Sequence, residues 1–175
     1  ADGAALYGDY PQTQFVGYES LSCQARVLGI FSDGTQRSKA EQGQEIQLIL
    51  DRTAFYGEGG GQTGDVGTIT TGQASLQVEA VSKFRGVFIH KARVEQGSIC
   101  TGDEVSCEVC PYYRNGVARN HTATHLLQAA LKRVLGDHIK QAGSSVAEDL
   151  LRFDFTHFEA VSKKDLARVE VEVNG

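Results

Sequence analysis

Residues 119–127 read Arg-Asn-His-Thr-Ala-Thr-His-Leu-Leu, and this stretch marks the change from a strand-like to a helical pattern. The helical pattern predicts a helix over about residues 120–135, which Gly136 is expected to end. His121 and His125 are four residues apart in it. At that spacing both imidazoles leave one helix face and can converge on one metal ion or one reacting group.

The helix should have one apolar face. At 100° per residue, a single broad arc holds Ala123, Leu126, Leu127, Ala130, Leu131 and Val134. The two histidines lie roughly opposite this arc, beside Gln128 and Lys132. A core histidine would belong on the arc, so two interpretations stay open: a solvated polar face, or the wall of a metal or catalytic site.

Before residue 111, the chain consists of short runs of alternating apolar residues. They are Ile46, Leu48 and Leu50, then Leu76, Val78 and Ala80, then Val87, Ile89 and Ala92, the last run with a slip of one residue. Turn sequences separate the runs: Asp33-Gly34, Glu41-Gln42-Gly43, Thr71-Gly72 and Gln96-Gly97. The pattern predicts a small antiparallel barrel or sandwich over residues 1–110.

After the helix, two more elements are expected. Alternation near residues 151–158 predicts a half-buried strand. Ser162 and Asp165 resemble a capping box that opens a second helix through Leu166, Val169 and Val173. The fold class is therefore α+β, with a β domain over 1–110 and a mixed domain over 111–175.

Residues 55–67, Phe-Tyr-Gly-Glu-Gly-Gly-Gly-Gln-Thr-Gly-Asp-Val-Gly, form a glycine-rich segment. No Gly-Lys-Ser or Gly-Lys-Thr follows, which excludes a P-loop, and no helical pattern follows, which argues against a dinucleotide fingerprint. A bulged connection between strands and a ligand-binding loop both remain open. Gln62 and Asp65 are its candidate polar residues.

Composition limits the class of protein. The chain has 175 residues, 41% hydrophobic content and a net charge of −5, which argues against a module that binds nucleic acid through a general basic surface. No apolar run approaches the roughly 20 residues that a bilayer requires, and no signal peptide is recognisable. We therefore expect a soluble protein with no membrane partner.

The four cysteines have no disulfide-like spacing and are expected to be reduced. Cys107 and Cys110, with His121 and His125, come near the spacing of a two-Cys, two-His zinc finger. Strand alternation, however, places the two cysteines on opposite sides, which favours buried or inert thiols.

Four segments in order carry a family resemblance: 55–67, 121–127, 141–146 and 151–157. Together they resemble the editing region of alanyl-tRNA synthetases, over about residues 15–174. Freestanding alanyl-tRNA editing proteins share these motifs, and the editing domain of threonyl-tRNA synthetases shares the histidine helix.

The resemblance implies a translation-protein-like antiparallel β-barrel to residue 110 and an incomplete α/β editing domain over 111–175. It implies zinc-dependent hydrolysis of serine or glycine wrongly attached to tRNA(Ala), in the cytoplasm or an organelle. The partners would be mischarged tRNA(Ala) and the remainder of a synthetase, whose separate aminoacylation domain alone would bind ATP.

The resemblance also implies residue roles. His121 and His125 would bind zinc, Thr124 would sense the serine hydroxyl, and Gln141 and Gln62 would take part in editing. Weaker candidates are Thr122, Ser144 and His157, whereas His90 and His138 look ordinary. For Gln141 the residues alone favour a surface amide.

One departure from the family matters. Family members complete the zinc site with a cysteine and a histidine four apart downstream, and nothing after His125 matches that pair. Two histidines should hold zinc loosely. Together with the absence of methionine, this predicts a processed or excised piece with weak zinc binding and little hydrolysis.

Two alternatives remain: a freestanding editing protein, and a non-catalytic tRNA-binding barrel of translation-factor type. Candidate tRNA contacts are Arg114, Arg119, Lys83 and Arg85, for which solvated surface charge is the competing interpretation.

Overall fold

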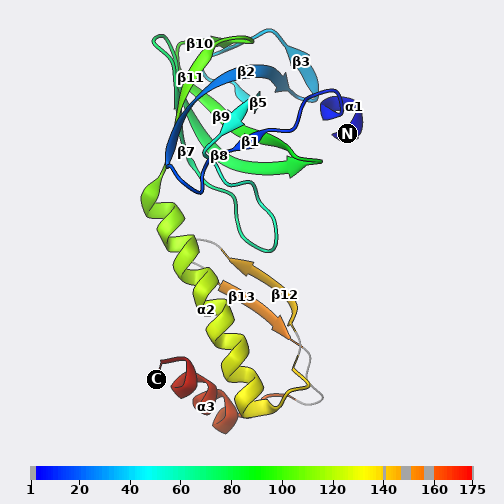
Figure 1. Cartoon of the computed structure of the whole chain (residues 1–175), viewed down its shortest axis with the longest axis vertical. Helices are drawn as coiled ribbons and strands as arrows, with labels where there is room; N and C mark the ends of the chain where they lie inside the picture. The colour runs from blue at the N-terminus through cyan, green and yellow to red at the C-terminus, as the bar shows by residue number, and fades with distance from the viewer. Residues whose placement is uncertain (1–2, 140, 147–150, 156–159, 175) are drawn as a thin grey trace. The chain divides into compact units, whose positions relative to one another are not determined.

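The computed structural model describes residues 3–139, 141–146, 151–155 and 160–174, with the backbone alone for 3–4, 121, 141–146 and 151–154. The chain forms two compact units (Figure 1). The first contains residues 1–59 and 64–114, and the second contains 60–63 and 115–175. The change of architecture predicted near residue 111 therefore lies close to the boundary between the units.

The first unit is an antiparallel β-barrel. Its elements are α1 (Gly3–Tyr7), β1 (Gln14–Phe15), β2 (Ser22–Ser32), β3 (Thr35–Arg37), β4 (Lys39–Glu41), β5 (Glu45–Leu50), β6 (Arg52–Thr53), β7 (Gly67–Thr70), β8 (Ser75–Phe84), β9 (Val87–Gln96), β10 (Ser98–Cys100) and β11 (Glu104–Val109). Neighbouring strands follow the order β11-β7-β8-β9-β5-β2, and β11 also pairs with β2, which closes the barrel. Of the two architectures expected from the sequence, the barrel is the one observed.

Alternating side chains fill the barrel interior. Ile46, Leu48 and Leu50 of β5 are buried, as the sequence predicts. On β8 the prediction fails at one position, because a bulge between Val78 and residue 80 shifts the alternation. Ala80 is consequently exposed and Val81 is buried in its place.

The predicted Asp33-Gly34 turn joins β2 to β3. Both residues have positive φ, 51° and 73°, as a two-residue type I′ turn requires. Arg85 and Gly86 repeat this geometry between β8 and β9, with φ of 49° and 82°. A glycine at the second position meets this requirement without strain.

Helix α2 (Pro111–Leu135) begins well before the predicted residue 120. Proline suits the first position of a helix because its missing N–H would have no intrahelical partner there. The predicted end is confirmed: Gly136 has φ of 115° and its N–H donates to the Lys132 carbonyl at 3.0 Å.

The second unit contains most of α2, then β12 (Gln141–Val146) antiparallel to β13 (Leu151–Phe155), then α3 (Lys163–Asn174). Its buried apolar cluster is Ala130, Leu131, Ile139 and Val169. The strand and helix predicted after α2 are both present.

The predicted cap of α3 is also present. The Ser162 hydroxyl accepts a hydrogen bond from the Asp165 N–H at 3.1 Å and donates to its carboxylate at 2.9 Å. Among the described residues, no helix has the length and apolar character needed to cross a bilayer.

Candidate functional site

Helix α2 separates the candidate residues between its buried and exposed faces. Val117, Thr124 and Leu131 are buried, at 2%, 6% and 2% exposure. Leu126, which the sequence places on the apolar arc, is 51% exposed. The buried face is therefore rotated from the predicted arc toward Thr124.

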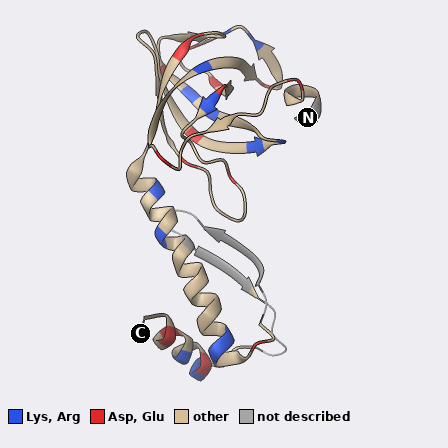
Figure 2. Cartoon of the chain, viewed as in Figure 1, with Lys and Arg blue, Asp and Glu red and all other residues tan. Residues whose placement is uncertain are grey.

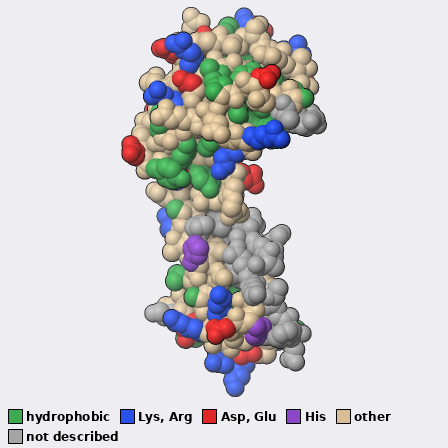
Figure 3. Space-filling view, turned by 45° about the vertical axis from the view of Figure 1, so that its right-hand side comes forward, with side chains coloured by type: hydrophobic (Ala, Val, Ile, Leu, Met, Phe, Trp, Pro, Cys, Tyr) green, Lys and Arg blue, Asp and Glu red, His purple; other side chains and the backbone are tan. Residues whose placement is uncertain are grey.

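His125 lies on the exposed side of α2. Residue 121 is one helical turn earlier on the same helix. The His121 side chain lies outside the described residues. Figure 3 shows histidine side chains at the surface of the unit that holds α2. Of the two interpretations left open by the sequence, exposure of His125 is compatible with both.

Thr124 holds its hydroxyl in a fixed direction. Its Oγ1 donates to the Asn120 carbonyl at 3.0 Å, one helical turn earlier. Because that bond uses the only hydroxyl proton, the oxygen can act toward a ligand only as an acceptor. Thr122 makes the same type of bond to Ala118 at 3.2 Å, but its side chain is exposed.

The described residues do not supply a complete set of metal ligands. In the part of the chain that the structure describes, no group of three or more His, Cys, Asp or Glu residues could hold a metal ion. Cys107 is fully buried in the barrel core, and among the described residues it forms no group of three or more possible metal ligands with Cys110. Positions 121 and 125 are one helical turn apart on α2, which is the backbone spacing of a pair of metal ligands on one helix face.

The glycine-rich segment forms a loop between β6 and β7. Gly60 and Gly61 have φ of 59° and 79°, which allows a tight turn at the tip. A Cβ on Gly64 would lie 2.5 Å from the Val81 carbonyl oxygen, and one on Gly67 would collide with that of Glu108. These glycines thus serve the connection itself, while Gln62 remains half-buried beside the turn.

The other family-implied candidates have less structural description. Gln141 is the first residue of β12 and pairs in register with Phe155, and Ser144 pairs with residue 153. The side chains of Gln141 and Ser144 and the whole of His157 lie outside the described residues.

The buried Asp65 and the partly buried Arg114 form an ion pair that the sequence does not reveal. The Asp65 carboxylate accepts from the Tyr56 N–H at 2.8 Å and from Arg114 Nε at 3.0 Å, and Arg114 Nη2 makes a further, shorter bond to it. Arg114 also donates to the carbonyls of Gly17 and Ala54, at 2.8 and 2.7 Å. The first turn of α2 is thereby fixed to three segments of the barrel unit, so Arg114 serves the fold.

His90 is confirmed as a structural residue. Its Nδ1 lies 3.0 Å from the Leu48 carbonyl, which can only accept, so Nδ1 carries the proton and Nε2 accepts from the Thr53 hydroxyl at 2.8 Å. Burial lowers the pKa of His90 to about 4, against a smaller opposing effect of the Leu48 hydrogen bond. The imidazole is therefore neutral at pH 7.

The remaining cationic candidates lie at the surface. The Lys83 ammonium lies 5.6 Å from the centre of the Tyr56 ring, and Arg85 lies 5.3 Å from the centre of the Phe84 ring. Arg119 is exposed on α2. Figure 2 shows Lys and Arg, but no acidic residue, along α2.

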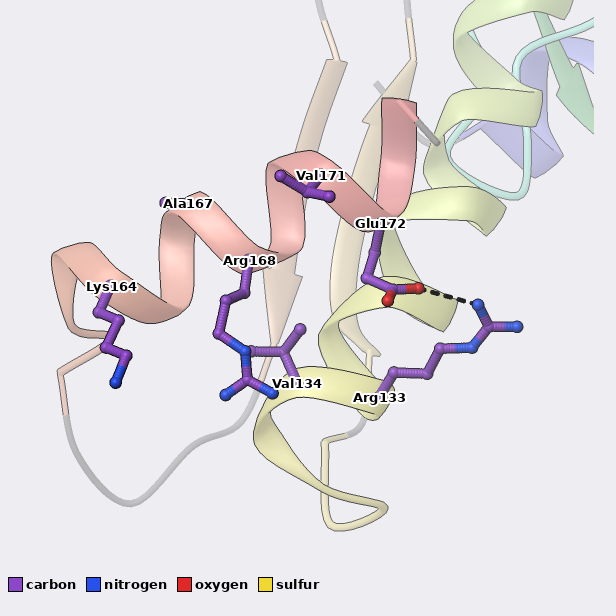
Figure 4. A pocket seen from close by; sticks show the side chains of 7 residues that line it. All are labelled: Arg133, Val134, Lys164, Ala167, Arg168, Val171 and Glu172. Atoms are coloured by element: carbon purple, nitrogen blue, oxygen red, sulfur yellow. Dashed lines mark hydrogen bonds and ion pairs between the residues drawn. The ribbon is translucent and has the colours of Figure 1, made fainter.

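A groove lined by several basic side chains lies between the end of α2 and α3, and it was not predicted from the sequence. It has a volume of about 480 Å³ and is lined by Arg133, Val134, Lys164, Ala167, Arg168, Val171 and Glu172 (Figure 4). Arg133 donates to Glu172 at 2.9 Å. The lining has three basic side chains and one acidic one, drawn from helices separated by about thirty residues of sequence.

Comparison with known proteins adds a family. The family described as tRNA synthetases class II (A) matches residues 2–111. The chain is also 48% identical to an alanine–tRNA ligase of Thermus thermophilus over 170 residues, which are 97% of the chain and 19% of that protein. Similar relatives occur in Chloroflexus aurantiacus, 46% identical over 95% of the chain, and Bacillus velezensis, 45% identical over 98%. The chain spans about a fifth of the length of these relatives.

Proposed function

Because the chain belongs to the class II alanyl-tRNA synthetases, we propose that it takes part in hydrolysing serine or glycine wrongly attached to tRNA(Ala). The observation that carries this proposal is the histidine-bearing α2, whose exposed side presents His125 within a chain matched over 97% of its length. The activity belongs to the cytoplasm in this proposal, and ATP would bind only in an aminoacylation domain outside these residues.

A need for such correction follows from the chemistry of selection. A pocket shaped for alanine has no steric means to exclude glycine, and one added hydroxyl gives it little discrimination against serine. A second site that hydrolyses the wrong ester restores accuracy. The ester between amino acid and ribose is activated, so modest catalysis is sufficient.

We propose that zinc binds to His121 and His125, since their spacing on α2 and the exposure of His125 allow both to face one ion. When bound, zinc would polarise a substrate group or activate a water. The helix would contribute spacing, because positions 121 and 125 are one helical turn apart on α2.

Thr124 supports discrimination of serine in this proposal. Its hydroxyl proton is committed to the Asn120 carbonyl, so the oxygen presents a lone pair. A serine hydroxyl can donate to that lone pair, whereas the methyl group of alanine cannot. Gln62 beside the glycine turn and Gln141 at the start of β12 are proposed to position the substrate.

The basic groove between α2 and α3 is proposed as a contact for the tRNA backbone. Of its basic side chains, Arg133 pairs with Glu172 at 2.9 Å and Arg168 pairs with Asp165 at 3.6 Å, while Lys164 adds a further positive charge that can face a phosphate. Reversing Lys164 or Arg168 to Glu should weaken tRNA binding and reduce its salt dependence by about one phosphate contact each. Lys39→Glu on barrel strand β4 is the matched control.

The proposed activity is tested by hydrolysis of Ser-tRNA(Ala) and Ala-tRNA(Ala), with bound zinc quantified, in this chain and in a longer chain carrying the downstream Cys and His pair. The expected result is weak zinc binding by the chain and strong binding and serine-selective hydrolysis by the longer one. His125→Ala should reduce both readouts, and His138→Ala, another exposed histidine of the same unit, should change neither.

The relatives are alanine–tRNA ligases, which favours part of a ligase over a freestanding editing protein. Hydrolysis absent from both chains, with tRNA binding insensitive to His121→Ala and His125→Ala, would overturn the editing proposal. That outcome would support the non-catalytic tRNA-binding barrel instead.

A further inference from the structure

Two cysteines face each other where the barrel closes. Cys23 on β2 and Cys107 on β11 are directly opposite in the antiparallel register. Cys107 is buried on the inner face together with Val105 and Val109, and the half-buried Cys23 packs against the same core. Both thiols therefore point to the same side of the sheet.

This juxtaposition is compatible with a disulfide. Directly opposite residues of antiparallel strands have Cα atoms about 4.5–5.5 Å apart. Disulfides generally join Cα atoms about 4.4–6.8 Å apart. A bond between them needs side-chain rotation but no strand displacement.

The two thiols differ in reactivity. The hydrogen bond with Cys107 lowers the pKa of Cys23 to about 7, against an opposing effect of burial. The same hydrogen bond raises the pKa of Cys107, and burial raises it further. A substantial fraction of Cys23 is therefore thiolate near neutral pH, and its half-buried side chain leaves access to small oxidants.

We propose that Cys23 is a peroxide-reactive thiol that Cys107 resolves into a disulfide between β2 and β11. The Cys23 sulfur attacks one oxygen of hydrogen peroxide, the O–O bond breaks, and the departing hydroxide takes a proton to become water. The Cys107 sulfur, losing its proton, then attacks the Cys23 sulfenic acid, and the S–O bond breaks to release a second water. Two thiols are oxidised to one disulfide as one peroxide is reduced to two waters.

This modification would act on the barrel closure. Because β11 is the last barrel strand and β2 the first long one, the bond would join the two ends of the barrel covalently. The other two cysteines are in different settings: Cys100 is opposite Lys39 in the β10–β4 pair, and Cys110 follows the end of β11. They serve as internal references in the same chain.

The test treats the intact, reduced chain with hydrogen peroxide and follows each thiol by differential alkylation and mass spectrometry. The expected result is loss of the Cys23 and Cys107 thiols together, recovery of one cross-linked peptide pair, and a mass decrease of two hydrogens. Cys100 and Cys110 should remain alkylatable over the same time. Oxidation of Cys23 no faster than Cys100, or bridges that involve Cys100 or Cys110, would overturn the proposal.

Two variants separate the steps. Cys107→Ser should stop the reaction at a Cys23 sulfenic acid, which dimedone traps, and Cys23→Ser should leave Cys107 reduced. Cys100→Ser is the control and should oxidise like the unaltered chain. Sulfenic acid at Cys107 in the Cys23→Ser variant would contradict the assigned order, and the peptide mapping of the unaltered chain decides the pairing even if a variant does not fold.

Discussion

The barrel unit and the α2–α3 unit bury their apolar side chains in different ways. The barrel has a continuous apolar core and satisfies its buried His90 and Asp65 with paired partners. Among its described side chains, the second unit buries Ala130, Leu131, Ile139 and Val169, and both units leave some large apolar side chains at the surface. The difference indicates that pairing between distant strands organises the barrel, whereas packing of α2 against α3 organises the described part of the unit that holds the candidate histidines.

The largest effect should come from the Asp65–Arg114 pair. Arg114→Ala leaves the buried Asp65 carboxylate without its charged partner, and the free energy of unfolding should fall by about 3–5 kcal/mol. Urea unfolding followed by circular dichroism measures this loss. The matched control is Arg26→Ala, whose exposed pair with Glu104 should contribute less than about 1 kcal/mol. Equal losses in the two variants would show that the barrel does not depend on this pair.

A second prediction tests the core of the α2–α3 unit. Leu131→Ala should destabilise it by about 3 kcal/mol, because Leu131 is 2% exposed. Leu126→Ala should cost less than about 0.5 kcal/mol, because its side chain is at the surface. Hydrogen exchange of the α2 and α3 amides reports both. A larger loss for Leu126→Ala than for Leu131→Ala would support the apolar arc predicted from the sequence and contradict the rotated buried face.

A third prediction concerns acid. The pKa of His90 is lowered to about 4 in the folded barrel, against 6.5 as its ordinary value, so the unfolded state binds the proton first as pH falls. Its contribution to stability is complete above pH 6.5 and is lost progressively as pH falls toward 4, by about 2 kcal/mol at pH 5. Urea midpoints between pH 7 and 5 give the profile. His90→Gln should flatten it, and an unchanged profile would exclude His90 as its source.

The smallest effect should come from the cap of α3. Ser162→Ala removes the hydroxyl that accepts the Asp165 N–H, at a cost of about 1 kcal/mol. Hydrogen exchange should rise in the first turn of α3 and leave the barrel strands unchanged. A rise in the barrel as well would show that the two units share one cooperative transition. Ser20→Ala, at an exposed barrel hydroxyl, is the comparison.

Local patterns in the sequence predicted much of the fold. Alternation in β5, the Asp33-Gly34 turn, the end of α2 and the Ser162 cap depend on residues a few positions apart, and all were predicted correctly. The predicted start of α2 near residue 120 was wrong, because the helix begins at Pro111, and proline favours a first helical position.

Features that join distant residues could not be predicted from local patterns. Asp65 and Arg114 are 49 residues apart, and nothing near either one indicates the partner. The rotation of the α2 face depends on what packs against it, which helical periodicity does not specify. For the candidate site, the sequence alone predicted that His121 and His125 lie one turn apart on a helix. The roles of Thr124, Gln62 and Gln141 came only from the family resemblance.

The pairing of β11 with β2 has a consequence for the order of synthesis. These strands lie at opposite ends of the barrel sequence, with Glu104 opposite Arg26 and Glu108 opposite Ser22. On the ribosome, the barrel has no closing strand until residues 104–109 have left the exit tunnel, and until then β2 and β7 each have an unpaired edge open to other chains. Folding of this unit therefore begins with the local hairpins and finishes late, at the seam where Cys23 and Cys107 meet.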